Sequence, residues 1–157
     1  MSFVCVTSVF GYRKSANQHT LTQGIPNELR PFVWMEISGA SQKKAEFASS
    51  YFVSTATAPP QNEAHEGHVK QIELDVPRTF PEHTFFKSRQ GQRALTMTLR
   101  ALAVHMPDIG YCQSLNYVAG LLLLVLDHDP EDAFWVLVVL IESAPLLLCP
   151  PLSLIHI

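Results

Sequence analysis

Apolar residues recur at helical spacing along most of this chain. The clearest pattern lies between residues 90 and 106, where Leu95, Leu99, Leu102 and Met106 occupy positions i, i+4, i+7 and i+11. Four apolar side chains at these intervals share one face of an α-helix, and the polar residues between them face the other way. The pattern therefore predicts an amphipathic helix with one buried face.

Other segments show weaker helical signals, bounded by turn-forming residues. Helices are expected over residues 28–37, from Ser41 through Phe52, over 69–76, over 110–126 and over 133–143. The Pro-rich stretch 55–67 is expected to be a surface loop, and Pro77 should place Arg78 at or just beyond a helix end. The run VLVVLI could be a buried strand on periodicity alone, but its length and neighbours favour a helix. The predicted fold class is all-α.

Composition and charge narrow the function classes. The chain has 157 residues, is 47% hydrophobic and carries a net charge of −3, which suits one globular domain. A near-neutral chain lacks the basic surface expected of a nucleic-acid-binding protein, so no nucleic-acid partner is expected. The three cysteines form neither a CxxC pair nor an even set, which favours a reducing cytoplasmic compartment over a disulfide framework or a zinc knuckle. No apolar run is long enough for a transmembrane segment.

Common catalytic motifs are absent. The sequence has no GxSxG motif, no GxxxxGK[ST] motif and no HExxH motif, so neither a hydrolase triad nor nucleotide binding by this chain itself is expected. His65, His68 and His83 could suggest a metal site, but they lie in or near the predicted loop without a carboxylate at ligand spacing. The interpretation as solvent-exposed loop residues is preferred for them.

Two polar residues stand in apolar surroundings and need partners. Arg78 follows IELDVP, and Gln113 follows Tyr111 at the start of a strongly apolar run. A buried polar group costs free energy unless it is hydrogen-bonded. One interpretation is structural, with Arg78 paired to Asp75 and Gln113 capping a neighbouring helix. The other is that both side chains are held for a ligand, and the residues alone leave the two open.

Three motifs together resemble the TBC domain of Rab GTPase-activating proteins. GIPNELRPFVW, with Arg30 four residues before Trp34, resembles the first motif of that family. IELDVPR places Ile72, Asp75 and Arg78 at the fixed positions of the motif IxxDxxR. YCQ, residues 111–113, fits the motif YxQ. The order and approximate separation of the three also match the family.

The resemblance implies a mechanism with two catalytic side chains supplied in trans. Arg78 would neutralise charge developing on the phosphates, and Gln113 would orient the attacking water in a Rab-family small GTPase in its GTP form. The chain would need no cofactor of its own, because GTP and magnesium come with the Rab. It would act as a GTPase activator in vesicle trafficking, without independent hydrolase activity, and would be cytoplasmic and peripheral at endomembranes through its partner.

The same resemblance suggests roles for other residues and bounds for the domain. Asp75 and Tyr111 would support the two catalytic residues, Ile72 belongs to the same motif, and Arg30 and Trp34 would be structural, with Trp34 as a core anchor. Residues 24–148 would form a partial TBC domain that lacks much of its C-terminal lobe. Residues 1–23 would be a lead-in without assigned function, and residues 149–157 a tail outside the family pattern. Ser114-Leu115 departs from the Gly-Met that often follows the family's glutamine.

Incomplete coverage of the family pattern keeps two further hypotheses open. The chain could be a non-catalytic or inactive truncated fragment that acts at most as a Rab-binding helical module, or a gene-model fragment of a longer activator. A partial domain should also leave apolar faces uncovered on the helices at residues 110–126 and 133–148, with a risk of aggregation. Retention of both Arg78 and Gln113 favours the activator.

Overall fold

The computed structural model describes residues 25–143, and within that range the chain is all-α, as predicted. The elements, in chain order, are η1 Asn27–Leu29, α3 Arg30–Ser38, α4 Ala40–Ala45, α5 Tyr51–Ala56, α6 Glu63–Asp75, η2 Val76–Arg78, α7 Thr84–Lys87, α8 Arg89–His105, α9 Leu115–Val125 and α10 Pro130–Ser143. The proposed lead-in, residues 1–23, and tail, residues 149–157, lie outside the described residues.

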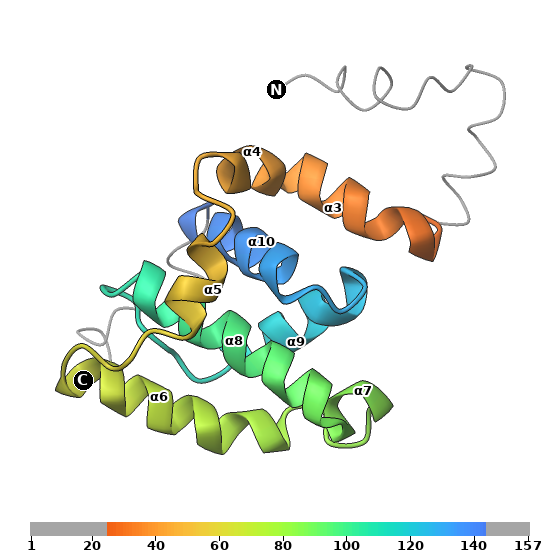
Figure 1. The fold of residues 1–157 in the computed structure, drawn as a ribbon. Helices are drawn as coiled ribbons and strands as arrows, with labels where there is room; N and C mark the ends of the chain where they lie inside the picture. The colour runs from red at the N-terminus through yellow and green to blue at the C-terminus, as the bar shows by residue number, and fades with distance from the viewer. Residues whose placement is uncertain (1–24, 144–157) are drawn as a thin grey trace, which may run out of the picture.

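Helix α8 is the centre of the fold. It packs against α5, α6, α7, α9 and α10 (Figure 1). Leu95, Leu99 and Leu102 are fully buried, which confirms the amphipathic helix predicted there. The Ser88 hydroxyl caps the helix by accepting a hydrogen bond from the Gly91 N–H at 3.0 Å. The apolar periodicity thus identified the helix around which the others are arranged.

The predicted helix from Ser41 through Phe52 is two helices, α4 and α5. Gly39, at φ +83°, ends α3 as expected and leads directly into α4, so Ser41 is not the N-cap. Between α4 and α5 the chain turns at residues 46–50. Phe47 in this turn packs its ring 4.8 Å from that of Trp135. This long-range aromatic contact accounts for a break that the local pattern did not indicate.

Helix α6 begins earlier than predicted. The Asn62 side chain accepts a hydrogen bond from the His65 N–H at 2.8 Å and starts the helix inside the expected loop. His65 is therefore a buried helical residue, and its description as a loop residue is wrong. The end of the helix is as predicted, because α6 closes at Asp75 and η2 carries Arg78.

Helix α9 begins later than predicted. Residues 110–114 form a turn, with Gly110 at φ +62° and Ser114 at φ +96°, and the helix starts only at Leu115. Gln113 therefore lies in a turn between α8 and α9. Helix α10 is mostly buried by packing against its neighbours, but α9 exposes Tyr117 (47%) and Leu121 (56%), one turn apart, so within residues 25–143 the expected uncovered apolar face is found on α9 and not on α10.

Helix α3 also exposes large apolar side chains. Trp34 is 40% exposed and Ile37 is 66% exposed, so Trp34 is not the core anchor that the sequence suggested. Helix α3 lies at the upper edge of the molecule in Figure 1 and packs on α4 and α10 through the buried Met35. One face of α3 consequently has no covering element in the described part of the chain.

Candidate functional site

Arg78 ends the short 3-10 helix η2 that follows α6. Pro77 has no N–H to continue the α-helical ladder, and the chain becomes extended at Thr79. The Arg78 side chain is 57% exposed. Its Nε donates to Asp75 Oδ1 at 2.8 Å, and its Nη2 donates to the same oxygen. The expected pairing of Arg78 with Asp75 is confirmed, yet much of the guanidinium remains open to solvent.

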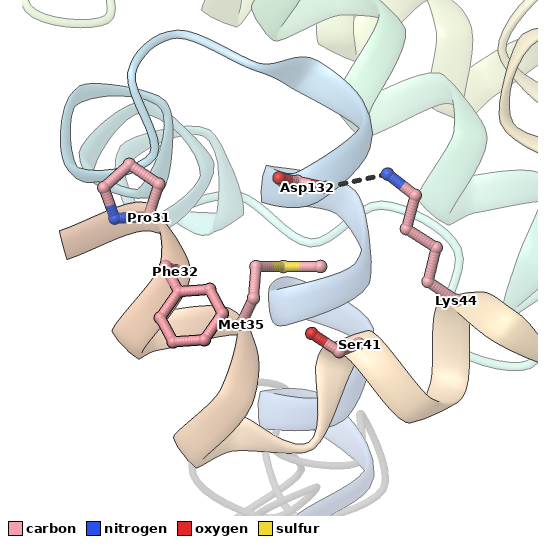
Figure 2. Close-up of a pocket in the computed structure, with 6 residues that line it drawn as sticks. All are labelled: Pro31, Phe32, Met35, Ser41, Lys44 and Asp132. Carbon is pink, nitrogen blue, oxygen red and sulfur yellow. Dashed lines mark hydrogen bonds and ion pairs between the residues drawn. The ribbon is translucent and has the colours of Figure 1, made fainter. Parts of the chain in front are cut away.

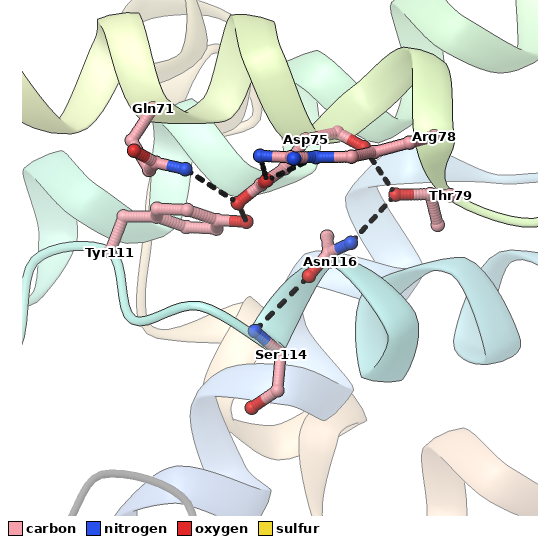
Figure 3. Close-up of polar contacts among 7 residues, drawn as sticks. All are labelled: Gln71, Asp75, Arg78, Thr79, Tyr111, Ser114 and Asn116. Atoms are coloured by element: carbon pink, nitrogen blue, oxygen red, sulfur yellow. Dashed lines mark hydrogen bonds and ion pairs between the residues drawn. The ribbon is translucent and has the colours of Figure 1, made fainter.

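Asp75 is a buried carboxylate on which three side chains converge (Figure 3). Besides Arg78, the Tyr111 hydroxyl donates to Oδ2 at 2.6 Å and Gln71 Nε2 donates to it at 3.2 Å. Burial by itself raises the Asp75 pKa, but the hydrogen bonds from Tyr111, Gln71 and Arg78 outweigh it and leave the pKa below its usual value. Burial, followed by the hydrogen bond to Asp75, raises the Tyr111 pKa. Asp75 is thus held ionised and Tyr111 protonated.

A second polar link joins the same two segments a few residues further on. Asn116 Nδ2 donates to Thr79 Oγ1 at 2.8 Å, and Asn116 Oδ1 accepts the Ser114 N–H at 3.2 Å. Asn116 and Thr79 are both buried. Figure 3 shows both links, from the segment at 75–79 to the turn and first residues of α9. Two separate side-chain bridges therefore connect residues 75–79 with the turn at 110–114 and the first residues of α9.

Gln113 lies in the chain between Tyr111 and Asn116, the two residues that form these bridges. Tyr111 precedes it and Asn116 follows it, just as Asp75 and Thr79 flank Arg78. Gln113 is exposed, and its side chain makes no hydrogen bond to any residue in the range 25–143. It does not cap a neighbouring helix, so the structural interpretation of this residue is wrong. The fold brings Arg78 and Gln113 onto neighbouring, cross-linked segments and leaves both side chains accessible.

The other residues singled out in the sequence lie outside this network. Ile72 is completely buried on the inner face of α6 and packs in the core. Arg30 is exposed, and its Nε donates to the Ile25 carbonyl oxygen at 3.0 Å. Trp34 is on the partly exposed helix α3. None of the three takes part in the hydrogen bonds around Asp75.

Several residues of this network do not belong to the sequence motifs. They are Gln71, Thr79 and Asn116, together with His68, whose Nδ1 accepts the Tyr111 N–H at 3.3 Å. Gly110 packs closely on the same ring, since a Cβ built there would lie 2.1 Å from His68 Nε2. Asn116 offered one signal, as a lone carboxamide at the start of an apolar helix; nothing local pointed to Thr79 as its partner.

Two pockets in the described part of the chain lie away from this network. A shallow pocket of about 330 Å³ between α3, α4 and α10 is lined by Met35, Ser41 and the ion pair between Lys44 and Asp132, whose Nζ–Oδ1 distance is 2.8 Å (Figure 2). A second, of about 460 Å³, is lined by Arg93 and Arg100 among others. Neither includes Arg78 or Gln113.

Two further findings bear on the metal and membrane expectations. Within residues 25–143, no three His, Cys, Asp or Glu side chains gather as a metal site would require. Over the same range, none of the helices combines the length and the apolar character needed to cross a bilayer.

The sequence of this chain is similar to those of known TBC-domain proteins. Residues 27–151 match the model of the Rab-GTPase-TBC domain. Small G protein signaling modulator 3 of Homo sapiens is 42% identical over 124 residues, which is 76% of this chain and 16% of that protein. Growth hormone-regulated TBC protein 6 of Caenorhabditis elegans is 35% identical over 126 residues, or 80% of this chain and 34% of that protein.

Solved structures agree with this match. The flagellar RabGAP TBC domain of Chlamydomonas superposes with a TM-score of 0.69 at 37% identity, covering 82% of this chain and 44% of that one. The YPT/Rab-GAP domain of Gyp1p superposes with a TM-score of 0.59 at 24% identity, which supports the fold alone. The chain therefore spans less than half of the flagellar domain and about a sixth of the human relative.

Proposed function

Because the chain belongs to the Rab-GTPase-TBC domain family, we propose that it accelerates GTP hydrolysis by a Rab-family small GTPase in its GTP form. The observation that carries the proposal is the pair of exposed side chains, Arg78 and Gln113, on two segments bridged by Asp75–Tyr111 and Thr79–Asn116. The arrangement offers one cation and one carboxamide to a partner, from backbone segments that are already tied together. The chain supplies no cofactor, since GTP and Mg²⁺ come with the Rab.

Arg78 acts on the phosphates. Hydrolysis breaks the bond between the γ-phosphorus and the β–γ bridging oxygen, and negative charge develops on the phosphate oxygens as GDP leaves. A guanidinium is permanently charged and offers paired N–H donors, so it stabilises that charge better than an ammonium. Arginine residues inserted in trans contribute about 10³ to 10⁵ in rate.

Gln113 acts on the water. A carboxamide can accept one hydrogen of the water and donate an N–H at the same time, so it can align the attacking oxygen with the γ-phosphorus. The exposure of Gln113 and its lack of a side-chain partner among residues 25–143 support this role. Gln113 would then take the place of the water-positioning glutamine of the GTPase itself.

Asp75 and Tyr111 support Arg78 without contacting the substrate. The Asp75 carboxylate holds Nε and Nη2, which restricts the guanidinium before the Rab arrives and lowers the entropy lost on binding. Arg78 can keep its Nε bond to Asp75 and present the rest of its guanidinium to phosphate. A role in vesicle trafficking and a peripheral location at endomembranes would follow from the Rab partner.

The experiment that tests this function is phosphate release from a panel of GTP-loaded Rabs with the parent chain. Arg78→Ala and Gln113→Ala are expected to remove the acceleration, and Arg78→Lys is expected to restore little of it, because an ammonium lacks the planar donor pair. Arg93→Ala is the matched control: it removes the same charge from an exposed site on α8 and should leave the rate unchanged.

One alternative function makes a different prediction for the same panel. A non-catalytic Rab-binding module would bind a GTP-loaded Rab without accelerating hydrolysis, and Gln113→Ala would change neither property. The exposed apolar face of α3 is the observation that favours this alternative. Rab binding without acceleration would replace the activator with it.

A further inference from the structure

Asn116 lies in the first turn of α9, is 2% exposed and uses both ends of its carboxamide. Its Oδ1 accepts the Ser114 N–H and its Nδ2 donates to Thr79 Oγ1. The Thr79 hydroxyl proton is already committed, because Oγ1 donates to the Asp75 carbonyl oxygen at 2.8 Å. Thr79 can therefore only accept from Asn116, which fixes the orientation of the amide. A carboxamide can donate and accept at once, as this position requires.

The two residues that Asn116 joins are the residues that follow the proposed catalytic side chains. Ser114 directly follows Gln113, and Thr79 directly follows Arg78. Ser114 has φ +96°, a conformation that costs a residue with a Cβ about 1–3 kcal/mol and persists only where its surroundings hold it. The hydrogen bond from the Ser114 N–H to Asn116 is one such restraint. Asn116 thus holds the turn and the end of η2 in one register.

We propose that Asn116, acting through Thr79, is a positioning residue that keeps Gln113 aligned with Arg78. This inference rests on the proposed function. Asn116 and Thr79 are buried and cannot contact a Rab directly, so their loss should change the alignment of the two side chains more than Rab affinity. A misplacement of about 1 Å can cost on the order of 100-fold in rate. We expect kcat to fall by about 10- to 100-fold while KM for the GTP-loaded Rab stays within about twofold.

The first test needs no Rab. In Thr79→Val the hydroxyl is lost from the residue that follows η2, but every atom of the turn at 110–114 remains. If the bridge exists, amide hydrogen exchange at Ser114, resolved by NMR or by fragmentation mass spectrometry, becomes about tenfold faster. Thr79→Ser keeps the hydroxyl and should restore slow exchange. Unchanged exchange in Thr79→Val overturns the inference.

Thr98→Val is the matched control for that test. Thr98 is fully buried in α8 and its hydroxyl donates to the Ala94 and Pro130 carbonyl oxygens, so the variant also removes a buried hydroxyl. It should destabilise the fold without a selective effect at Ser114. An equal acceleration of exchange at Ser114 in Thr98→Val would mean that Thr79→Val acts through global stability, and would also overturn the inference.

The second test is kinetic and separates the inference from the proposed function. Asn116→Ala, Thr79→Val and the double variant are compared in phosphate release, where a shared bridge gives a double variant no slower than the slower single one. Additive losses, or a rise in KM at constant kcat, overturn the inference while the function stands. If the parent chain accelerates no Rab, the function fails, and exchange at Ser114 alone decides whether Asn116 couples the segments.

Discussion

At the scale of single residues, Asp75 determines how Arg78 is presented. Asp75 is 1% exposed, and its carboxylate accepts hydrogen bonds from Tyr111, Gln71 and Arg78. The hydrogen bonds from Arg78 are local, three residues apart, whereas the bond from Tyr111 spans 36 residues. One side chain thus joins the segment that carries Arg78 to the turn that carries Gln113.

Asp75→Asn is expected to destabilise the chain at neutral pH by about 1–3 kcal/mol, because the amide presents N–H donors to groups that are themselves donors. The Asp75 pKa is lowered in the folded state, so the stabilisation is complete above the unfolded-state value of 3.8 and is lost as pH falls through the folded-state pKa. Urea unfolding measured from pH 7 to pH 3 should show that the difference in the free energy of unfolding between parent and variant becomes smaller below about pH 4.

Glu66→Gln is the control for this pH series. Glu66 forms an exposed ion pair with Lys70 on the same helix, at 2.8 Å. Loss of this ion pair should change the free energy of unfolding too little to measure. If the difference in the free energy of unfolding between the parent and Asp75→Asn stays constant down to pH 3, the role given to the Asp75 carboxylate is contradicted.

At the scale of elements, the turn before α9 depends on close packing as well as on hydrogen bonds. Gly110 adopts φ +62° against the ring of His68 on α6, and the next N–H, that of Tyr111, donates to the same ring. Only a residue without a Cβ allows this approach. The turn is therefore held near both ends, by His68 of α6 at its start and, at its finish, by the bridge from Asn116 to Thr79, which follows η2.

Gly110→Ala is expected to weaken the packing of this turn against His68. A Cβ would meet His68 Nε2 at 2.1 Å, so the ring or the turn must move, and the left-handed conformation adds about 1–2 kcal/mol of strain. Thermal unfolding should show a larger loss of stability than in Gly39→Ala, where φ is +83° but nothing lies within 4 Å of the added Cβ. GTPase activation should fall only in Gly110→Ala; equal effects in the two variants would show that backbone strain alone is responsible.

At the scale of the whole molecule, burial is uneven. The core around α8, α9 and α10 contains the large buried side chains, including Trp135 and Phe134, whereas α3 exposes Trp34 and Ile37. Contiguous apolar surface of this kind promotes association. The exposed Trp34 and Ile37 both lie on α3, the first α-helix of the described range. The chain covers 44% of the flagellar TBC domain.

Ile37→Lys is expected to reduce aggregation without loss of stability, because Ile37 is 66% exposed and a charge there costs little burial. Light scattering during heating should show that aggregation of the variant begins at a higher temperature than aggregation of the parent. Ile141→Lys, at a site 1% exposed, should instead prevent folding, since it places an unpaired charge in the core. An unchanged onset in Ile37→Lys would mean that α3 does not drive association.

The sequence by itself determined the helical class, the amphipathic helix α8, the end of α6 and the identity of Arg78 and Gln113 as the residues of interest. These features depend on local apolar spacing, on Pro77 and on motifs a few residues long. The tertiary structure alone decided that α4 and α5 are separate, that Gln113 lies in a turn, that Trp34 is exposed, and that Asn116 joins Thr79. Each of these depends on contacts between segments far apart in the chain, such as Phe47 with Trp135, and periodicity within one segment carries no information about such pairs.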